Sequence, residues 1–143
     1  MHDYCSTSDI QQRLTEAGVK NLADRNRDGS LSGTETTSSL TTAIGWAGTE
    51  IDAALTELMP ISTARGAAND WLKQRAVDLA SFRACSQGGR SVPESLRLDY
   101  ERSLQLLEEV RTGSRMIPGL TYQLPYDSPA STMRAPRVTN VER

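Results

Sequence analysis

The stretch LTTAIGWAGTEIDAALTELM, residues 40–59, decides the fold that we expect for this chain. Its larger apolar residues recur every three or four positions, which is the spacing of one face of an α-helix. Pro60 follows the stretch and ends the pattern, because proline cannot continue a helix interior. We therefore predict a long helix over Thr34–Met59 with a buried stripe formed by Leu40, Ile44, Ala47, Ile51, Leu55 and Leu58.

Two glycines, Gly45 and Gly48, lie inside this predicted helix. Each costs about 1 kcal/mol relative to alanine at an interior helical position. Such a cost is tolerable where a second backbone packs closely against the helix. The sequence therefore predicts a close helix crossing near these two positions.

Three further helices are predicted around the long one. A short helix follows the capping candidates at residues 6–9 and stops at Gly18, a third spans residues 67–86, and a fourth ends near Gly113. Ser91 is the predicted N-cap of the fourth helix, with Pro93 in its first turn. With only 5% aromatic residues among 143, helices with small contact residues fit the composition better than a sheet.

The expected fold is therefore mainly α. Residues 1–116 form a small four-helix domain that includes an acidic loop at residues 24–35, and residues 117–143 form an extended, proline-rich C-terminal arm. Basic residues alternate with acids along the third and fourth helices, which is typical of a solvated face. These basic residues are Lys73, Arg75, Arg83, Arg97, Arg102 and Arg111.

The acidic loop DRNRDGSLSGTE, residues 24–35, matches a twelve-residue calcium loop at the positions which that pattern specifies. About seven oxygen ligands are available, enough for Ca²⁺. The same residues also suit a turn that bonds its own backbone amides, so the calcium site remains one of two interpretations. If calcium binds there, the ion is expected to stabilise the loop and to have a structural role only. The candidate ligands are Asp24, Asn26, Asp28, Ser30, Ser32 and Glu35.

Apolar residues alternate with polar residues or proline in the first part of the arm. This period predicts an extended segment with one apolar face that docks on a partner, and a disordered tail is the alternative. The candidate interaction residues are Leu120, Tyr122, Leu124 and Tyr126.

Bulk properties narrow the function classes. The net charge of −2 gives no cationic field for tight nucleic-acid binding. No secretory leader or run of about eighteen apolar residues is visible, so neither secretion by that route nor a membrane span is expected. Cys5 and Cys85 are expected to be free thiols rather than a disulfide. The only histidine, His2, is close to a terminus, so no catalytic set is expected and the chain is not predicted to be an enzyme.

Taken together, several segments resemble the Mu-like head-tail connector family of tailed bacteriophages. These are the N-terminal segment DYCSTSD at residues 3–9, the loop LADRNRDG at 22–29, the motif EID at 50–52, and stretches of the third and fourth helices, up to about residue 120. The loop departs from the family pattern in having Asn26 where an acid is usual, and the arm departs from it in its length.

The resemblance implies a small helical protein whose copies form a ring, commonly a dodecamer, beneath the portal. Such a ring extends the DNA channel, lets DNA pass without sequence-specific binding, and offers a docking surface for the tail or its terminator protein. The expected location is the neck of the virion, after assembly in the host cytoplasm, with no membrane partner. The alternative function is a calcium-dependent interaction module with a dockerin-like loop.

Overall fold

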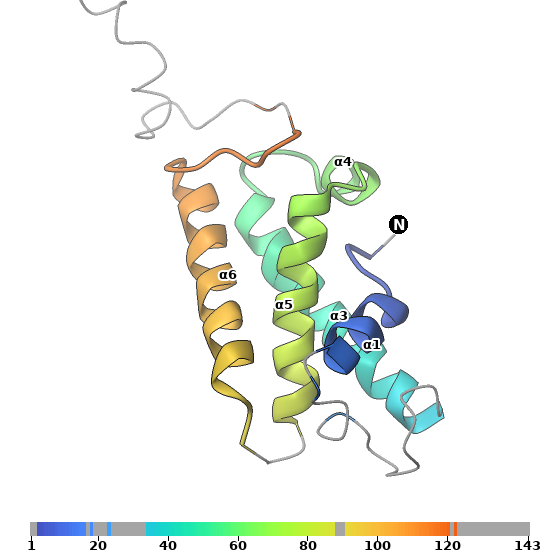
Figure 1. Ribbon diagram of the computed structural model, residues 1–143. Helices are drawn as coiled ribbons and strands as arrows, with labels where there is room; N and C mark the ends of the chain where they lie inside the picture. Colours follow the sequence, from blue (N-terminus) through green and yellow to red (C-terminus); the bar gives the residue numbers. More distant parts are fainter. Residues whose placement is uncertain are drawn as a thin grey trace, which may run out of the picture.

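The computed structural model describes residues 3–16, 18, 23, 34–87, 91–120 and 122, with the side chains of residues 34–36 excepted. Within these ranges the chain is helical and contains no β-strand, which confirms the mainly α prediction. Figure 1 shows the arrangement, with α5 in front of α3 and with α6 and α1 on opposite sides. The helices are α1 (Thr7–Glu16), α3 (Thr34–Leu55), α4 (Ile61–Gly66), α5 (Asp70–Ser86) and α6 (Glu94–Thr112).

The core lies between α3, α5 and α6. The predicted stripe on α3 is buried, and Leu40, Ile51 and Leu55 are 0% exposed. α3 and α5 make the most extensive contact between two helices in the described part of the chain, and α1, α4 and α6 also pack against α3. The 3.6-residue period of the stripe is thus explained by one face of α3 that is turned inward over residues 40–55.

α1 begins with a reciprocal cap. The backbone N–H of Ser6 donates to Asp9 Oδ2 at 2.8 Å, and the N–H of Asp9 donates to Ser6 Oγ at 3.3 Å. The predicted capping residues therefore act as expected. Burial opposes ionisation of Asp9, but hydrogen bonds from Ser6 and Lys73 outweigh it and hold the pKa of Asp9 below its ordinary value.

The region after α3 differs from the prediction. α3 ends at Leu55, and the N–H groups of Leu58 and Met59 bond to the Leu55 carbonyl in a turn. Pro60 then serves as the N-cap of α4, a helix that the sequence did not predict. Proline is favoured where a helix starts as well as where one stops, and six residues are too short to show a helical period.

α5 and α6 keep their predicted ends more closely than their starts. α5 begins at Asp70, three residues later than expected, because the Asn69 side chain caps it by accepting the N–H of Leu72 at 3.0 Å. The prediction of Ser91 as the N-cap of α6 is wrong, since Pro93 holds that position and no side chain caps it. Gly113 ends α6 with φ +88°, as predicted.

The predicted helix crossing at the two glycines is also wrong. A Cβ added at Gly45 would meet nothing within 4 Å, and the residue is exposed. At Gly48 the nearest atom would be Nη2 of Arg65 at 3.0 Å, a side chain rather than a backbone. Gly48 therefore makes room for a guanidinium group, and Gly45 has no packing partner within the described protomer.

Candidate functional site

The predicted calcium ligands lie outside the described part of the structure. Glu35 falls within α3, but its side chain is among those not described. The calcium site therefore stays a prediction. Elsewhere, the described residues contain no group of three or more His, Cys, Asp or Glu that could hold a metal ion. The ligands that stay untested are Asp24, Asn26, Asp28, Ser30, Ser32 and Glu35.

The start of the predicted arm is part of the folded body. Ile117 is 1% exposed, and its N–H donates to the Tyr122 hydroxyl at 2.8 Å. Leu120 and Tyr122 pack against the core, and the Leu120 N–H donates to the Ile117 carbonyl at 3.3 Å. Residues 117–120 thus form a closed turn instead of an extended strand, because burying Ile117 requires the chain to bend back. Leu124 and Tyr126 lie outside the described residues.

A side chain from the start of α5 holds this turn in place. Nδ2 of Asn69 donates to the Pro118 carbonyl at 2.7 Å, and a Cβ at Gly119 would lie 3.0 Å from the same nitrogen. Gly119 also has φ +84°, which favours glycine. The exit of the chain is therefore fixed to the segment between α4 and α5.

The N-terminal segment is tied to α3 and α4 through one arginine, which we call the Arg65 clamp (Asp3, Tyr4, Asp52 and Arg65). Nη2 of Arg65 lies 2.6 Å from Asp52 Oδ2, and Nη1 lies 3.3 Å from Asp3 Oδ1. The Tyr4 hydroxyl donates to Asp52 Oδ1 at 2.7 Å, and the guanidinium lies 5.1 Å from the Tyr4 ring centroid. The side chains of Arg65 and Asp52 are 14% and 24% exposed, so solvent screens their contact weakly, whereas Asp3 is 54% exposed and its contact is screened more strongly.

The pKa shifts agree with this geometry. The hydrogen bond to Asp52 raises the pKa of Arg65 against the opposing effect of burial. Burial, followed by the bond to Asp52, raises the pKa of Tyr4. Both groups therefore keep their ordinary protonation states at neutral pH.

Sequence reasoning did not find the Arg65 clamp. Tyr4 and Asp52 belong to two separate segments that carry the family resemblance, and the structure joins them directly. Arg65 lies on the helix that was missed, and no local pattern marks it. A charged residue next to a buried one within α3, such as Asp52 after Ile51, was the available signal.

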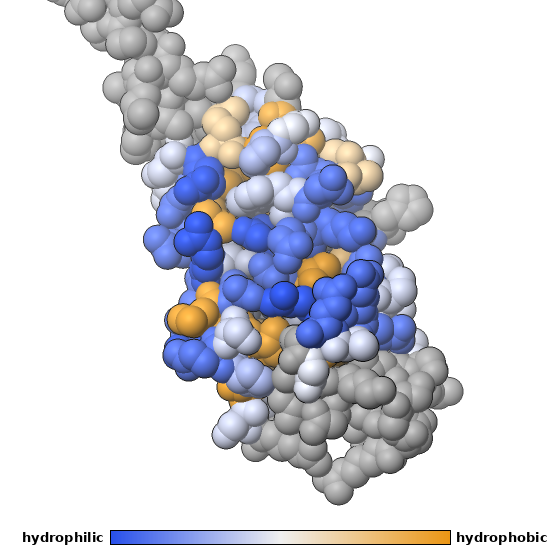
Figure 2. All heavy atoms as spheres, viewed as in Figure 1, coloured by the Kyte–Doolittle hydropathy of each residue, from blue (hydrophilic) through white to orange (hydrophobic). Residues whose placement is uncertain are grey.

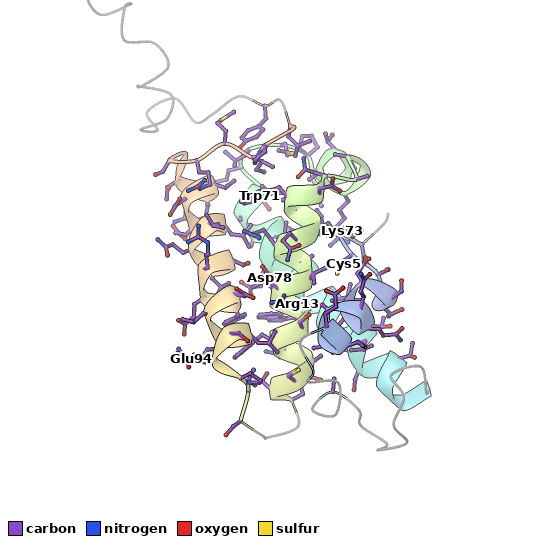
Figure 3. All side chains as sticks on the ribbon, viewed as in Figure 1. Cys5, Arg13, Trp71, Lys73, Asp78 and Glu94 are labelled. Carbon is purple, nitrogen blue, oxygen red and sulfur yellow. The ribbon has the colours of Figure 1, made fainter. Side chains whose placement is uncertain are left out.

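A second polar cluster connects α5 to α6 inside the bundle. Asp78 is 6% exposed and accepts hydrogen bonds from Ser103 Oγ and Gln74 Nε2, each at 3.0 Å. Arg75 Nη2 lies 3.4 Å from Asp78 Oδ2. Arg13 on α1 also pairs with Asp99 on α6, and Figure 3 shows Arg13 and Asp78 at similar height in the bundle.

Burial has the largest effect on the pKa values of Asp78 and Arg75 in this cluster. It raises the pKa of Asp78 although Ser103, Arg75 and Gln74 favour the carboxylate, and it lowers the pKa of Arg75. The prediction that Arg75 belongs to a solvated face is therefore wrong, because its side chain is 13% exposed and faces Asp78. Arg97 and Arg111 do lie in exposed pairs with acids on α6.

Both cysteines are buried and free, as predicted. Burial raises the pKa of Cys85 to about 11 and that of Cys5 to about 12. Since the thiolate is the reactive form, neither thiol is activated.

Among the hollows on the surface of the described residues, two lie between pairs of helices. A polar groove of about 370 Å³ runs between α1 and α5 and is lined in part by Asp9, Glu16 and Lys73. A groove of about 250 Å³ lies between α3 and α6, which we call the α3–α6 groove. Figure 2 shows that the face toward the viewer is mainly hydrophilic, with hydrophobic residues in small groups. The α3–α6 groove is lined by Glu50, Ala53, Ala54, Leu104, Leu107, Glu108 and Arg111.

Fold and contacts define a small helical bundle whose N-terminal segment and chain exit are both tied to the helices. No helix among the described residues is long and apolar enough to cross a membrane. A protein-family model described as "Bacteriophage Mu, Gp36" matches residues 4–134, and the chain belongs to this family. Family membership confirms the Mu-like resemblance and indicates a structural protein of a phage particle.

The family match also shows how far the common region extends. It continues past residue 120, where the resemblance was expected to end, and includes much of the proline-rich arm. Comparisons with curated proteins and with solved structures gave no match.

Proposed function

We propose that this protein is a structural adaptor in the neck of a tailed phage. Its copies assemble into a ring beneath the portal, extend the DNA channel and dock the tail. The observation that carries the proposal is the family match over residues 4–134, which covers most of the chain. In this proposal the role is not enzymatic, and the partners are further copies, the portal protein and a tail or tail-terminator protein.

The form of the domain supports this role. The Arg65 clamp, the buried Asp78 cluster and the anchored chain exit join segments that are far apart in the sequence. Contacts of this kind restrain the segments that they join, and a subunit that is already ordered loses less conformational entropy when it assembles. A ring subunit benefits from such order because every copy must meet its neighbours in the same geometry.

The charge of the chain suits a channel through which DNA slides. With 18 acidic and 16 basic residues the net charge is −2, so phosphate contacts and counterion release contribute little attraction. DNA can then pass through the lumen without being held by it.

The proposal is tested by imaging the protein with and without the portal protein of the same phage. Negative-stain micrographs and mass photometry are expected to show annular oligomers, either of the protein alone or seated on the portal. A protein that stays monomeric alone and in mixtures with portal and tail proteins contradicts the proposal.

A further inference from the structure

A row of small, uncharged residues on α3 leads to Ala53, which lines the α3–α6 groove. Gly45, Thr49 and Ala53 follow one another at intervals of four residues and are all exposed. The Thr49 hydroxyl donates to the Gly45 carbonyl at 3.1 Å, so its hydrogen-bond donor is satisfied within α3. Because a Cβ at Gly45 would meet only open space, another helix can approach this row closely.

The groove itself combines an apolar floor with an acid at its edge. Leu107 and Ala54 are buried, and Leu104 is half-buried. The groove has a volume of about 250 Å³, which is enough for one branched side chain. Glu50 lines the groove and belongs to none of the ion pairs among the described residues.

A matching projection is present on another side of α6. Leu98 is 52% exposed and is the one large hydrophobic residue exposed in the described part of the chain. Arg102 follows one helical turn later, is exposed, and likewise joins none of the ion pairs described. This pair offers an apolar side chain beside a free positive charge, which complements the apolar floor and Glu50 of the groove.

The two surfaces cannot meet within one molecule. Leu98 and Leu104 are six residues apart on α6, so they point about 120° apart around the helix axis. A projection and a groove on different sides of one subunit give a head-to-tail contact between copies. Repeated with a closing rotation, such contacts form a ring.

We infer that the α3–α6 groove of one copy receives Leu98 from α6 of a second copy, with Arg102 paired to Glu50 across the contact. The helix crossing for which Gly45 makes room is then a crossing between copies. This inference rests on the proposed ring function and names the surfaces through which the ring closes.

The first test is Leu98→Glu, measured by size-exclusion chromatography with light scattering under conditions in which the wild-type protein assembles. Because Leu98 is exposed, the variant should keep the circular dichroism spectrum of the wild type. A buried charge in the groove should raise the concentration needed for half assembly by about tenfold or more. Ser62→Glu on α4, also exposed and with the same change in charge, is the matched control and should assemble normally.

The second test is a charge exchange. Arg102→Glu and Glu50→Arg should each weaken assembly, and the double variant should restore it, because the pair is re-formed with its signs reversed. If the wild type forms rings and Leu98→Glu assembles normally, the inference is wrong and the proposed function still holds. If the single variants weaken assembly and the double variant does not restore it, the Arg102–Glu50 pairing is wrong. If the wild type never assembles, both the inference and the proposed function are wrong.

Discussion

Ala68 has a backbone conformation that favours glycine. Its φ of +50° places it in the left-handed region, between the end of α4 and the Asn69 cap of α5. A non-glycine residue held there costs about 1–2 kcal/mol. The strain is maintained because Arg65 and Asn69, on either side, are fixed by their own contacts.

We predict that Ala68→Gly raises the free energy of unfolding by about 1 kcal/mol, since the relieved strain exceeds the extra chain entropy of glycine. Urea denaturation measures the change. Ala67→Gly is the matched control, because Ala67 has an ordinary φ of −76° and should lose stability instead. Equal effects at the two positions would contradict the argument from strain.

At the scale of elements, the Asp78 cluster links α5 to α6 and makes their contact sensitive to pH. The raised pKa of Asp78 means that the folded protein binds this proton more readily than the unfolded chain does. The contribution of Asp78 to stability is therefore fully present below the unfolded pKa of about 3.9 and declines as pH rises through the folded value.

We predict that Asp78→Asn removes this decline. The amide oxygen can accept the bond from Gln74, and the amide NH₂ can donate to the Ser103 hydroxyl, which then accepts. The free energy of unfolding of the variant minus that of the wild type should increase with pH from about 4 upward. Urea unfolding at a series of pH values measures the difference. If the difference in free energy of unfolding stays constant or falls over this pH range, the pKa of Asp78 is not raised in the folded protein.

The segment between α1 and α3 carries the predicted calcium loop. If Glu35 supplies two of the ligand oxygens, Glu35→Gln should weaken calcium binding by about tenfold or more in isothermal titration calorimetry. Glu50→Gln, on the same helix and outside the loop, is the control and should leave the affinity unchanged. Equal affinities of the wild type and Glu35→Gln would remove the site.

Over the whole molecule, the sequence predicted those features that repeat along the chain. The stripe from Leu40 to Leu55 identified α3, and glycine at position 113 identified the end of α6, because helical period and capping act locally. The fold class and the Mu-like family were predicted for the same reason, since both depend on motifs that can be read in order.

Features that depend on contacts between distant segments were missed. Asp52 and Arg65 meet only after the turn at Pro60 reverses the chain, and Ile117 enters the core only after α6 has returned to it. Gly45 was expected to pack against another helix within the molecule, but it faces open space at the surface. The candidate site was therefore only partly predictable, because an assembly surface consists of the residues that remain exposed after the helices have packed.

One consequence follows from the position of the two anchored ends. Asp3 is held by Arg65, and Pro118 is held by Asn69, so both attachments lie within five residues of each other at the α4 end of the bundle (Figure 1). If the proposed ring sets the bundle axes along its own axis, every copy would place these two attachments, at Asp3 and Pro118, at the same rim. The opposite rim would carry neither, so the ring would have two chemically distinct faces, as an adaptor between two different neighbours requires.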